Sequence, residues 1–196
     1  MTIERLYGLP GVFRLADPIS LNSGLIRPAT LSDIPAITAI YGASVVTGTA
    51  SFELAAPDEA EMGRRMAALG GSGHPFLAAE RAGRLLGYAY AGPYRPRPAY
   101  ANTVEDSLYV AAEAQRQGVG RALLRALVVE SAARGFRQMI AVIGDSNHAA
   151  SIRLHAAEGF AMVGTLKNVG YKHGRWLDSV LMQRSLGAGE TTPPTR

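Results

Sequence analysis

The chain has 196 residues, of which 47% are hydrophobic, so it can bury the core of one ordinary domain. It contains no cysteine, which excludes disulfides, thiolate metal ligands and a cysteine nucleophile. The 20 basic and 16 acidic side chains give a formal net charge of +4 without a long basic run, a pattern that does not favour a nucleic-acid partner but suits a small anionic ligand.

No stretch of the sequence has the features of a membrane or secretion segment. Residues 1–25 interrupt their apolar side chains with Glu4, Arg5, Arg14 and Asp17, so they lack the continuous hydrophobic run of a signal peptide. No apolar run is long enough to cross a bilayer. We therefore expect a cytoplasmic protein without a membrane partner.

The two ends of the chain differ in composition from its middle. Residues 1–24 show no sustained period and contain Gly8, Pro10, Gly11 and Pro18, so we expect an irregular extension. Residues 187–196 are small, polar and proline-bearing, and we expect them to be disordered. Residues 25–186 remain as a single domain of ordinary size.

The first half of this domain predicts two helices and a strand meander. Residues 25–27 form a strand candidate, and Thr30-x-x-Asp33 resembles a capping box before a helix. Pro57 and Asp58 open a second helix that the glycines at 70–73 terminate. Strands are predicted over 76–80 and 85–91, joined by a turn at Ala82–Gly83, and over 104–110.

The second half predicts a strand–helix–strand crossover. Helices are expected over 118–134 and 147–158, and strands over 139–143, 160–166 and 179–183. The longer helix carries one apolar stripe made of Val119, Leu123, Leu124, Leu127 and Val128. This order of elements indicates an α/β or α+β sheet with at least one parallel strand pair.

A loop with glycines at 118 and 120 lies between the strand at 104–110 and the following helix. Glycines let the backbone approach a ligand closely, and the first N–H groups of a helix have no partner within it, so the helix start favours a phosphate. Arg116 and Arg121 add positive charge. A dinucleotide fingerprint would need glycine in place of Leu123, and a P-loop would need Gly-Lys-Ser/Thr. Alone, the two glycines are equally compatible with close packing of a helix on a sheet.

The surroundings of this loop point to a more specific ligand. Gln115-x-x-Gly118-x-Gly120 follows an apolar strand, and a strand at 140–143 then leads to Asn147 and to a helix ending in Glu158-Gly159-Phe160. Over residues 25–183 this arrangement resembles the GNAT acetyltransferase superfamily. The resemblance implies a predominantly antiparallel sheet with a central splayed parallel strand pair and flanking helices, and acetyl-CoA as co-substrate. It implies cofactor contacts from Leu108, Tyr109, Val110, Gln115, Arg116, Gln117, Gly118, Val119, Gly120, Arg121, Asn147 and Ser151.

Three further segments resemble the phosphinothricin acetyltransferase branch of that superfamily. They are residues 92–110, residues 141–155 and the closing Tyr171-Lys172-His173-Gly174-x-Trp176-x-Asp178 stretch. The resemblance implies an amino-acid-like acceptor such as phosphinothricin or methionine sulfoximine, and a homodimer. Thr47–Phe52 resembles the early substrate loop of the branch, which makes Phe52 a substrate-binding candidate.

Two residues are candidates for catalysis. Acetylation of an amine that is protonated at neutral pH needs a general base. The resemblance assigns this role to Glu105, although a lone strand glutamate is more commonly a surface residue paired with an arginine. Asn147, Ser151 and His155 are spaced to share one helix face, with Asn147 as a possible N-cap. His155 stands where many family members have a tyrosine that protonates the leaving thiolate, so the general acid remains open.

The remaining candidates are acceptor contacts. Arg95, Arg97 and Tyr100 border a proline-rich loop, and guanidinium groups there would hold a carboxylate or phosphinate, although solvated loop charges are commoner. Lys172 and His173 are compatible with substrate contacts, dimer contacts or a simple turn. No metal-ligand spacing is present, and we assign no metal.

The sequence thus predicts an acetyl-CoA-dependent N-acetyltransferase acting on a small amino-acid analogue. Two alternatives stay open. One is a GNAT enzyme that acetylates a polyamine, a peptide or an antibiotic. The other is a non-catalytic acetyl-CoA-binding module.

Overall fold

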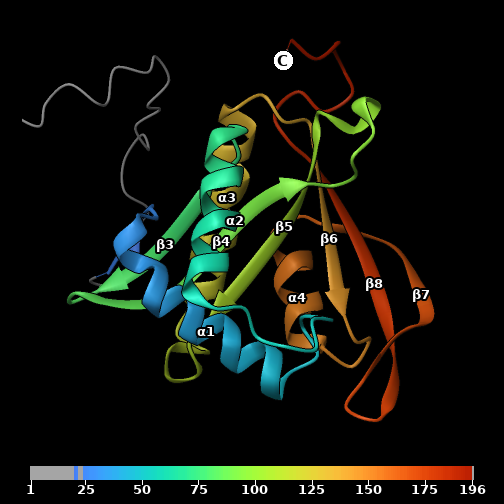
Figure 1. Ribbon diagram of the computed structural model, residues 1–196. Coiled ribbons are helices and arrows are strands. Elements are labelled where there is room, and N and C mark those ends of the chain that lie inside the picture. The colour runs from blue at the N-terminus through green and yellow to red at the C-terminus, as the bar shows by residue number, and fades with distance from the viewer. Residues whose placement is uncertain (1–19, 22–23, 196) are drawn as a thin grey trace, which may run out of the picture.

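The computed structural model describes residues 20–21 and 24–195, which form a mixed sheet with helices on both faces (Figure 1). The strands lie in the order β1-β2-β3-β4-β5-β6-β8-β7, and all neighbours are antiparallel except β5 and β6. Their bounds are β1 Ser20–Leu21, β2 Gly24–Pro28, β3 Phe76–Arg81, β4 Arg84–Pro93, β5 Thr103–Val110, β6 Gln138–Gly144, β7 Ala161–Lys172 and β8 Arg175–Ser185. The predicted α/β fold with one parallel pair is confirmed.

The helices divide between the two faces of the sheet. They are α1 Ile34–Thr47, α2 Glu59–Gly71, α3 Val119–Ala133 and α4 Ala149–Ala157, with short 3-10 turns η1 Leu31–Asp33, η2 Pro98–Tyr100 and η3 Ala112–Ala114. Successive strand residues point to opposite faces, so Tyr88 packs under α1 and α2 while Ala89 packs under α3. The predicted apolar stripe of α3 is buried along its whole length. Two hydrophobic clusters, one on either face, therefore pack the helices against the sheet.

The chain enters α1 through the predicted capping box. The Thr30 N–H donates to Asp33 Oδ2 at 2.7 Å, and one 3-10 turn precedes the α-helix. Arg27 on β2 donates to both Asp33 oxygens, at 2.8 and 2.7 Å, and to Glu80 on β3 at 2.9 Å. This charged group ties the helix start to the sheet.

The parallel pair separates halfway along its length. The ladder between β5 and β6 runs from Thr103–Gln138 to Asp106–Ala141 and then stops. Both strands continue, to Val110 and Gly144, but β5 stays paired only with β4 and β6 only with β8. The expected splay is therefore present, and it opens the middle of the sheet.

The last two strands are longer than predicted. The sequence pattern indicated 160–166 and 179–183, whereas β7 and β8 run to the turn at His173–Gly174. Irregularities in register between Met162 and Gly164 and between Leu166 and Gly170 break the alternation that would have revealed the strand. The hairpin therefore extends toward the loop after α1 (Figure 1).

The ends of the chain differ in part from expectation. Residues 1–19 and 22–23 of the predicted extension lie outside the described residues, while Ser20–Leu21 pair with β2. In the segment expected to be disordered, residues 187–190 form a turn in which the Gly189 N–H donates to the Leu186 carbonyl, and Arg137 donates to the Thr192 carbonyl at 2.6 Å; the disorder of the tail stays a prediction. Within the described part of the chain, no helix is long and apolar enough to cross a bilayer.

Candidate active site

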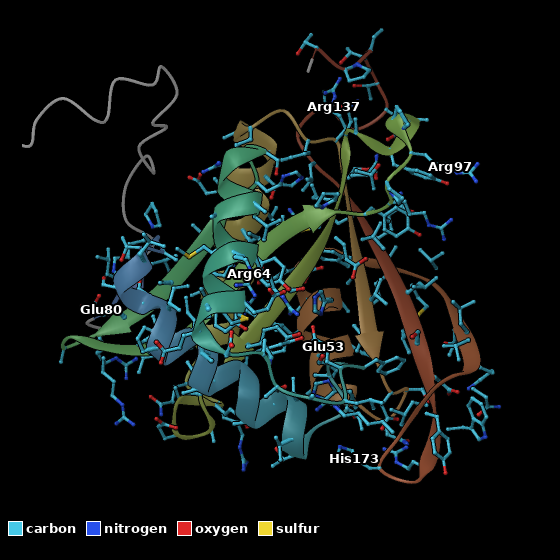
Figure 2. All side chains as sticks on the ribbon, viewed as in Figure 1. Glu53, Arg64, Glu80, Arg97, Arg137 and His173 are labelled. Carbon is cyan, nitrogen blue, oxygen red and sulfur yellow. The ribbon has the colours of Figure 1, made fainter. Side chains whose placement is uncertain are left out.

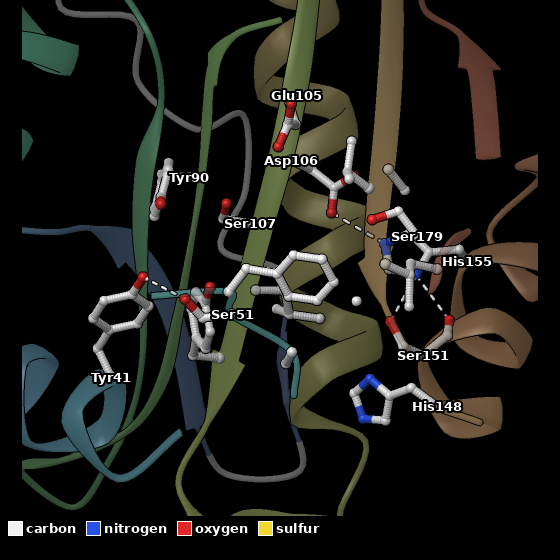
Figure 3. Close-up of a pocket in the computed structure, with 18 residues that line it drawn as sticks. Tyr41, Ser51, Tyr90, Glu105, Asp106, Ser107, His148, Ser151, His155 and Ser179 are labelled. Atoms are coloured by element: carbon white, nitrogen blue, oxygen red, sulfur yellow. Dashed lines mark hydrogen bonds and ion pairs between the residues drawn. The ribbon is translucent and has the colours of Figure 1, made fainter. Parts of the chain in front are cut away.

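A cavity of about 310 Å³ lies where β5 and β6 separate (Figure 3). Its walls come from β4, β5 and β6, from the loop after α1, from β8 and from α4. Because the splay opens the sheet, side chains of both strand faces reach this cavity. Glu105 and Tyr109 approach from the side of α1 and α2, and Asp106 and Leu108 from the side of α3.

In the described part of the chain, Glu105 contributes a carboxylate without a hydrogen-bond partner to the cavity. Its carboxylate has no hydrogen-bond or ion-pair partner among the described residues, so the alternative of a surface glutamate paired with an arginine is wrong. Burial raises the pKa of Glu105 to about 7, with the adjacent charge of Asp106 as a second cause. A free carboxylate with this pKa can accept a proton near neutral pH.

His155 lies on the opposite wall of the cavity, in an ion pair that the sequence did not reveal. Its Nε2 lies 3.0 Å from Asp106 Oδ2, and its Nδ1 lies 2.8 Å from the Ser151 carbonyl (Figure 3). Burial lowers the pKa of His155, but the hydrogen bond and charge of Asp106 and the Ser151 carbonyl together raise it above its usual value. Both side chains of the pair are at most 4% exposed.

Asp106 is therefore a site residue that sequence reasoning missed. Strand alternation places Asp106 on the face opposite Glu105, and only the splay brings the two to one cavity. The signal available in the sequence was a charged residue at a position whose strand neighbours on the same face, Val104 and Leu108, are apolar. Such a position predicts a paired or functional carboxylate.

Aromatic side chains form the wall nearest α1. The Tyr41 hydroxyl lies 2.9 Å from Ser51 Oγ, and its ring meets the Tyr109 ring edge-on at 4.8 Å. Tyr90 lines the same wall from β4. Burial raises the pKa values of Tyr41 and Tyr90 above their ordinary range, so these phenols stay neutral where Glu105 titrates. The sequence did not mark any of the three tyrosines except Tyr109.

The loop after α1 supplies the remaining wall, and Phe52 lines the cavity as expected. Its ring rests on two glycines, since a Cβ on Gly144 would lie 2.9 Å from the ring and a Cβ on Gly170 would lie 2.4 Å from it. Lys172 Nζ donates to the Ser51 carbonyl at 2.7 Å. The β7–β8 hairpin therefore fixes the position of this loop.

Lys172 and His173 do not line the cavity, and their observed contacts are with the loop. His173 Nε2 lies 3.1 Å from the Gly48 carbonyl, and Figure 2 shows His173 at the tip of the hairpin. Burial lowers the pKa of Lys172, with Glu53 acting in the opposite direction. Both side chains therefore support the cavity wall, and their contact with an acceptor stays a prediction.

Asn147 is placed differently from expectation. The helix begins at Ala149 with His148 as N-cap residue, so the predicted N-cap role of Asn147 is wrong. The cause is a turn in which the Asp145 carboxylate accepts the Asn147 N–H at 3.0 Å and stops the helix from starting earlier. Ser151 and His155 do share one helix face, but Asn147 lies in the turn before it.

The start of α3 has the geometry expected for an anion site. Gly118 is the N-cap residue and has φ +81, a conformation that favours glycine, and residues 119–121 have no intrahelical acceptor for their N–H groups. Val119 is buried in the core cluster under this helix. Arg121 Nε donates to Glu158 at 2.6 Å, and Gln117 accepts from Arg81 at 3.0 Å. Gln115, Arg116 and Gly120 complete an exposed or partly exposed rim.

These features fit an acetyl-CoA molecule. The positive start of α3 suits the phosphates, and the separated strands β5 and β6 leave an opening in the sheet. The cavity beyond this opening is lined by Leu108, Tyr109 and Ser151. Val110 packs against the core cluster at the entrance to the η3 turn. Most of the predicted cofactor residues therefore lie at the start of α3 or on the wall of the cavity, and their contacts with acetyl-CoA stay a prediction.

The predicted arginine contacts lie elsewhere. Arg95, Arg97 and Tyr100 belong to the loop between β4 and β5 and do not line the cavity. Arg95 stacks over the rings of Tyr94 and Tyr100 at 5.0 and 5.7 Å, and Figure 2 shows Arg97 extending away from the sheet. Their role toward an acceptor stays a prediction. In the described residues no group of three or more His, Asp or Glu side chains could hold a metal ion.

Comparison with known proteins identifies the family. A model described as an acetyltransferase (GNAT) domain matches residues 26–181. A phosphinothricin N-acetyltransferase of Alcaligenes faecalis is 56% identical over 86% of either chain. An L-methionine sulfoximine/L-methionine sulfone acetyltransferase of Pseudomonas paraeruginosa is 40% identical over 87% of this chain and 99% of the relative. The crystal structure of a GNAT superfamily phosphinothricin acetyltransferase from Sinorhizobium meliloti, in complex with acetyl-CoA, has a TM-score of 0.86 at 47% identity and covers 89% of this chain and 94% of that one. The chain therefore belongs to the GNAT acetyltransferases and is an N-acetyltransferase that uses acetyl-CoA.

Proposed function

We propose that this enzyme acetylates the amino group of a small amino-acid analogue such as phosphinothricin or methionine sulfoximine. The names of its relatives support this acceptor class. The observation that carries the mechanism is the untethered Glu105 carboxylate in the cavity, with its pKa of about 7. An amino acid presents a protonated amine at neutral pH, and the transfer needs that proton removed.

The residues of the cavity have different roles in the transfer of the acetyl group. Acetyl-CoA, when bound, supplies an activated acetyl thioester. Glu105 accepts the proton of the acceptor amine, directly or through one water, so the nitrogen lone pair can attack the thioester carbonyl carbon. The new C–N bond would replace the C–S bond, and CoA would leave as the thiolate. Tyr41, Tyr90 and Phe52 limit the space for the acceptor and exclude bulk water, which favours amine over water as the nucleophile.

The size of the cavity favours a small acceptor over a peptide. Its volume of about 310 Å³ lies at the lower end of the range of small-molecule sites. Phe52 and the aromatic side chains of Tyr41 and Tyr90 enclose it on the side of α1. The fixed loop around Ser51, held by Lys172, gives this wall a defined shape.

The test is release of free thiol from acetyl-CoA with phosphinothricin, methionine sulfoximine, methionine sulfone, common amino acids, a polyamine and a short peptide. Because the chain has no cysteine, the protein contributes no thiol background to this assay. We expect the highest kcat/KM with the amino-acid analogues. Preference for the polyamine or the peptide would reject the acceptor class. Binding of acetyl-CoA without turnover of any amine would reject catalysis.

We also propose a homodimer formed through β7. This strand is the edge of the sheet and is exposed along nearly all of its 12 residues, including Met162, Val163, Leu166 and Val169, which are 50–58% exposed. An apolar edge of this length is a strong surface for pairing with a second copy. Light scattering after size-exclusion chromatography should give twice the 20.7 kDa chain mass. A monomer at assay concentration would reject the dimer. We further propose the cytoplasm, where acetyl-CoA is available, as the site of action.

A further inference from the structure

The Asp106–His155 pair has a hydrogen-bond pattern that restricts what His155 can do. A carbonyl oxygen only accepts hydrogen bonds, so the 2.8 Å contact with Ser151 requires a proton on Nδ1. The other nitrogen, Nε2, lies 3.0 Å from the Asp106 carboxyl group. Both ring nitrogens are therefore engaged, and neither has a free lone pair directed at the cavity.

Few groups contact the ring of His155. The groups that face it are Asp106 from β5, Ser151 from α4 and the ring of Phe160, which meets it edge-on at 5.1 Å. No cation and no second carboxylate contacts the ring in the described part of the chain. The contact of Nε2 with a carboxylate oxygen at 3.0 Å favours a proton on this nitrogen, and the pKa of His155 is raised despite its burial.

We propose that Asp106 is a positioning residue that holds His155 as a doubly protonated, immobile ring across the opening between β5 and α4. This inference rests on the proposed function, which it refines. In this arrangement His155 does not take a proton from the acceptor, and Glu105 does. The opposite charges of Asp106 and His155 offset each other within the pair, which allows both side chains to stay buried beside the cavity.

The hydrogen bond between Asp106 and His155 also positions β5 relative to α4. Asp106 stands at the last paired position of β5 and β6, where the two strands begin to separate. His155 lies on α4, which packs beside β6 on the far side of this opening. Their hydrogen bond therefore fixes the width of the cavity at the point where the strands diverge. A shift of about 1 Å at a reacting position costs on the order of 100-fold in rate.

The direct test measures the protonation state of His155 by NMR. The spectrum of the His155→Asn variant assigns the His155 signals, because they are missing from it. We expect two ring N–H signals from His155 in the wild type at pH 7 and pH 8. Asp106→Asn should leave one signal, because the amide can donate to Nε2 and the ring becomes neutral. A single ring N–H in the wild type at pH 7 would overturn the proposal.

The kinetic test is a double-mutant cycle. Asp106→Asn should lower kcat by about 10- to 100-fold and leave KM for acetyl-CoA within about twofold. If Asp106 acts through His155, the double variant Asp106→Asn/His155→Asn should have a kcat no lower than that of the less active single variant. The reason is that the double variant leaves no buried unpaired charge. Losses that multiply across the cycle would overturn the proposal.

The control is Asp33→Asn. Asp33 is another buried aspartate in an ion pair, 8% exposed like Asp106, but it lies at the start of α1 and contacts Arg27. Its substitution should reduce thermal stability and leave kcat unchanged. The NMR result does not require an acceptor, so failure of the proposed acetylation would leave the protonation test intact. Conversely, normal turnover with a singly protonated His155 would reject the pair's role and leave the proposed function standing.

Discussion

Replacing Glu105 by glutamine should make the enzyme more stable and far less active. A carboxyl group whose pKa is raised on folding binds its proton more tightly in the folded state, so stability falls as pH rises from the unfolded pKa to the folded one. For Glu105 this window runs from 4.5 to about 7. The wild type therefore has its full loss of stability above pH 7 and no loss below pH 4. The substitution Glu105→Gln removes this loss.

The shift of Glu105 sets the size of the effect. At about 1.4 kcal/mol per pH unit, a shift from 4.5 to about 7 corresponds to roughly 3–4 kcal/mol as an upper bound. Glu105 is only partly buried, and solvent screening reduces this to about 2 kcal/mol. In a chain of this length, about 2 kcal/mol corresponds to a rise in Tm of about 4–8 °C.

The assay compares Glu105→Gln with the wild type by thermal and urea unfolding at pH 4 and pH 8. The variant should match the wild type at pH 4 and exceed it at pH 8. The kcat of the variant should fall by about 10²- to 10⁴-fold, and the acidic limb of the wild-type kcat/KM profile should bend near pH 7. Glu113→Gln, at an exposed position, should change stability by less than about 0.5 kcal/mol. Equal stability of Glu105→Gln and wild type at pH 8 would refute the reasoning.

Three further substitutions test the walls of the site. Gly170→Ala would put a Cβ 2.4 Å from the Phe52 ring, so KM for the acceptor should rise, whereas Gly164→Ala on the same strand meets nothing within 4 Å and should be silent in the same kinetic assay. Gly118→Ala forces an alanine to φ +81 at the helix start, and calorimetry should show weaker acetyl-CoA binding and a loss of about 1–2 kcal/mol in stability; unchanged affinity would count against the anion site. Lys172→Met keeps the aliphatic stem but removes the donor to the loop, so KM for the acceptor should rise about fivefold with little change in kcat, and an unchanged KM would show that the tether is dispensable.

The sequence was sufficient to predict the elements whose signals are local. The capping box at Thr30, the apolar stripe of α3 and the glycine at its start each depend on residues a few positions apart, and each was found where expected. The bulged β7 strand was predicted too short, because its irregular register hides the alternation of side chains.

The candidate site was predictable to a similar extent. Glu105, His155 and Phe52 were placed at the cavity by resemblance, and the structure brings all three to it. Asp106 was missed because its place in the cavity depends on two strands separating, which no local pattern encodes. The same holds for Lys172, whose partner at Ser51 lies on a distant part of the chain.

The contacts between the hairpin and the loop after α1 also bear on how the enzyme folds. The hydrogen bonds from Lys172 to Ser51 and from His173 to Gly48 join residues 121 and 125 positions apart in the sequence. Contacts of such separation form late, because the intervening chain must first be ordered. The wall on the acceptor side is therefore completed only when the last hairpin docks. On a ribosome, the cofactor half of the site can assemble first, and the enzyme gains its acceptor pocket after nearly all of the chain has been synthesised.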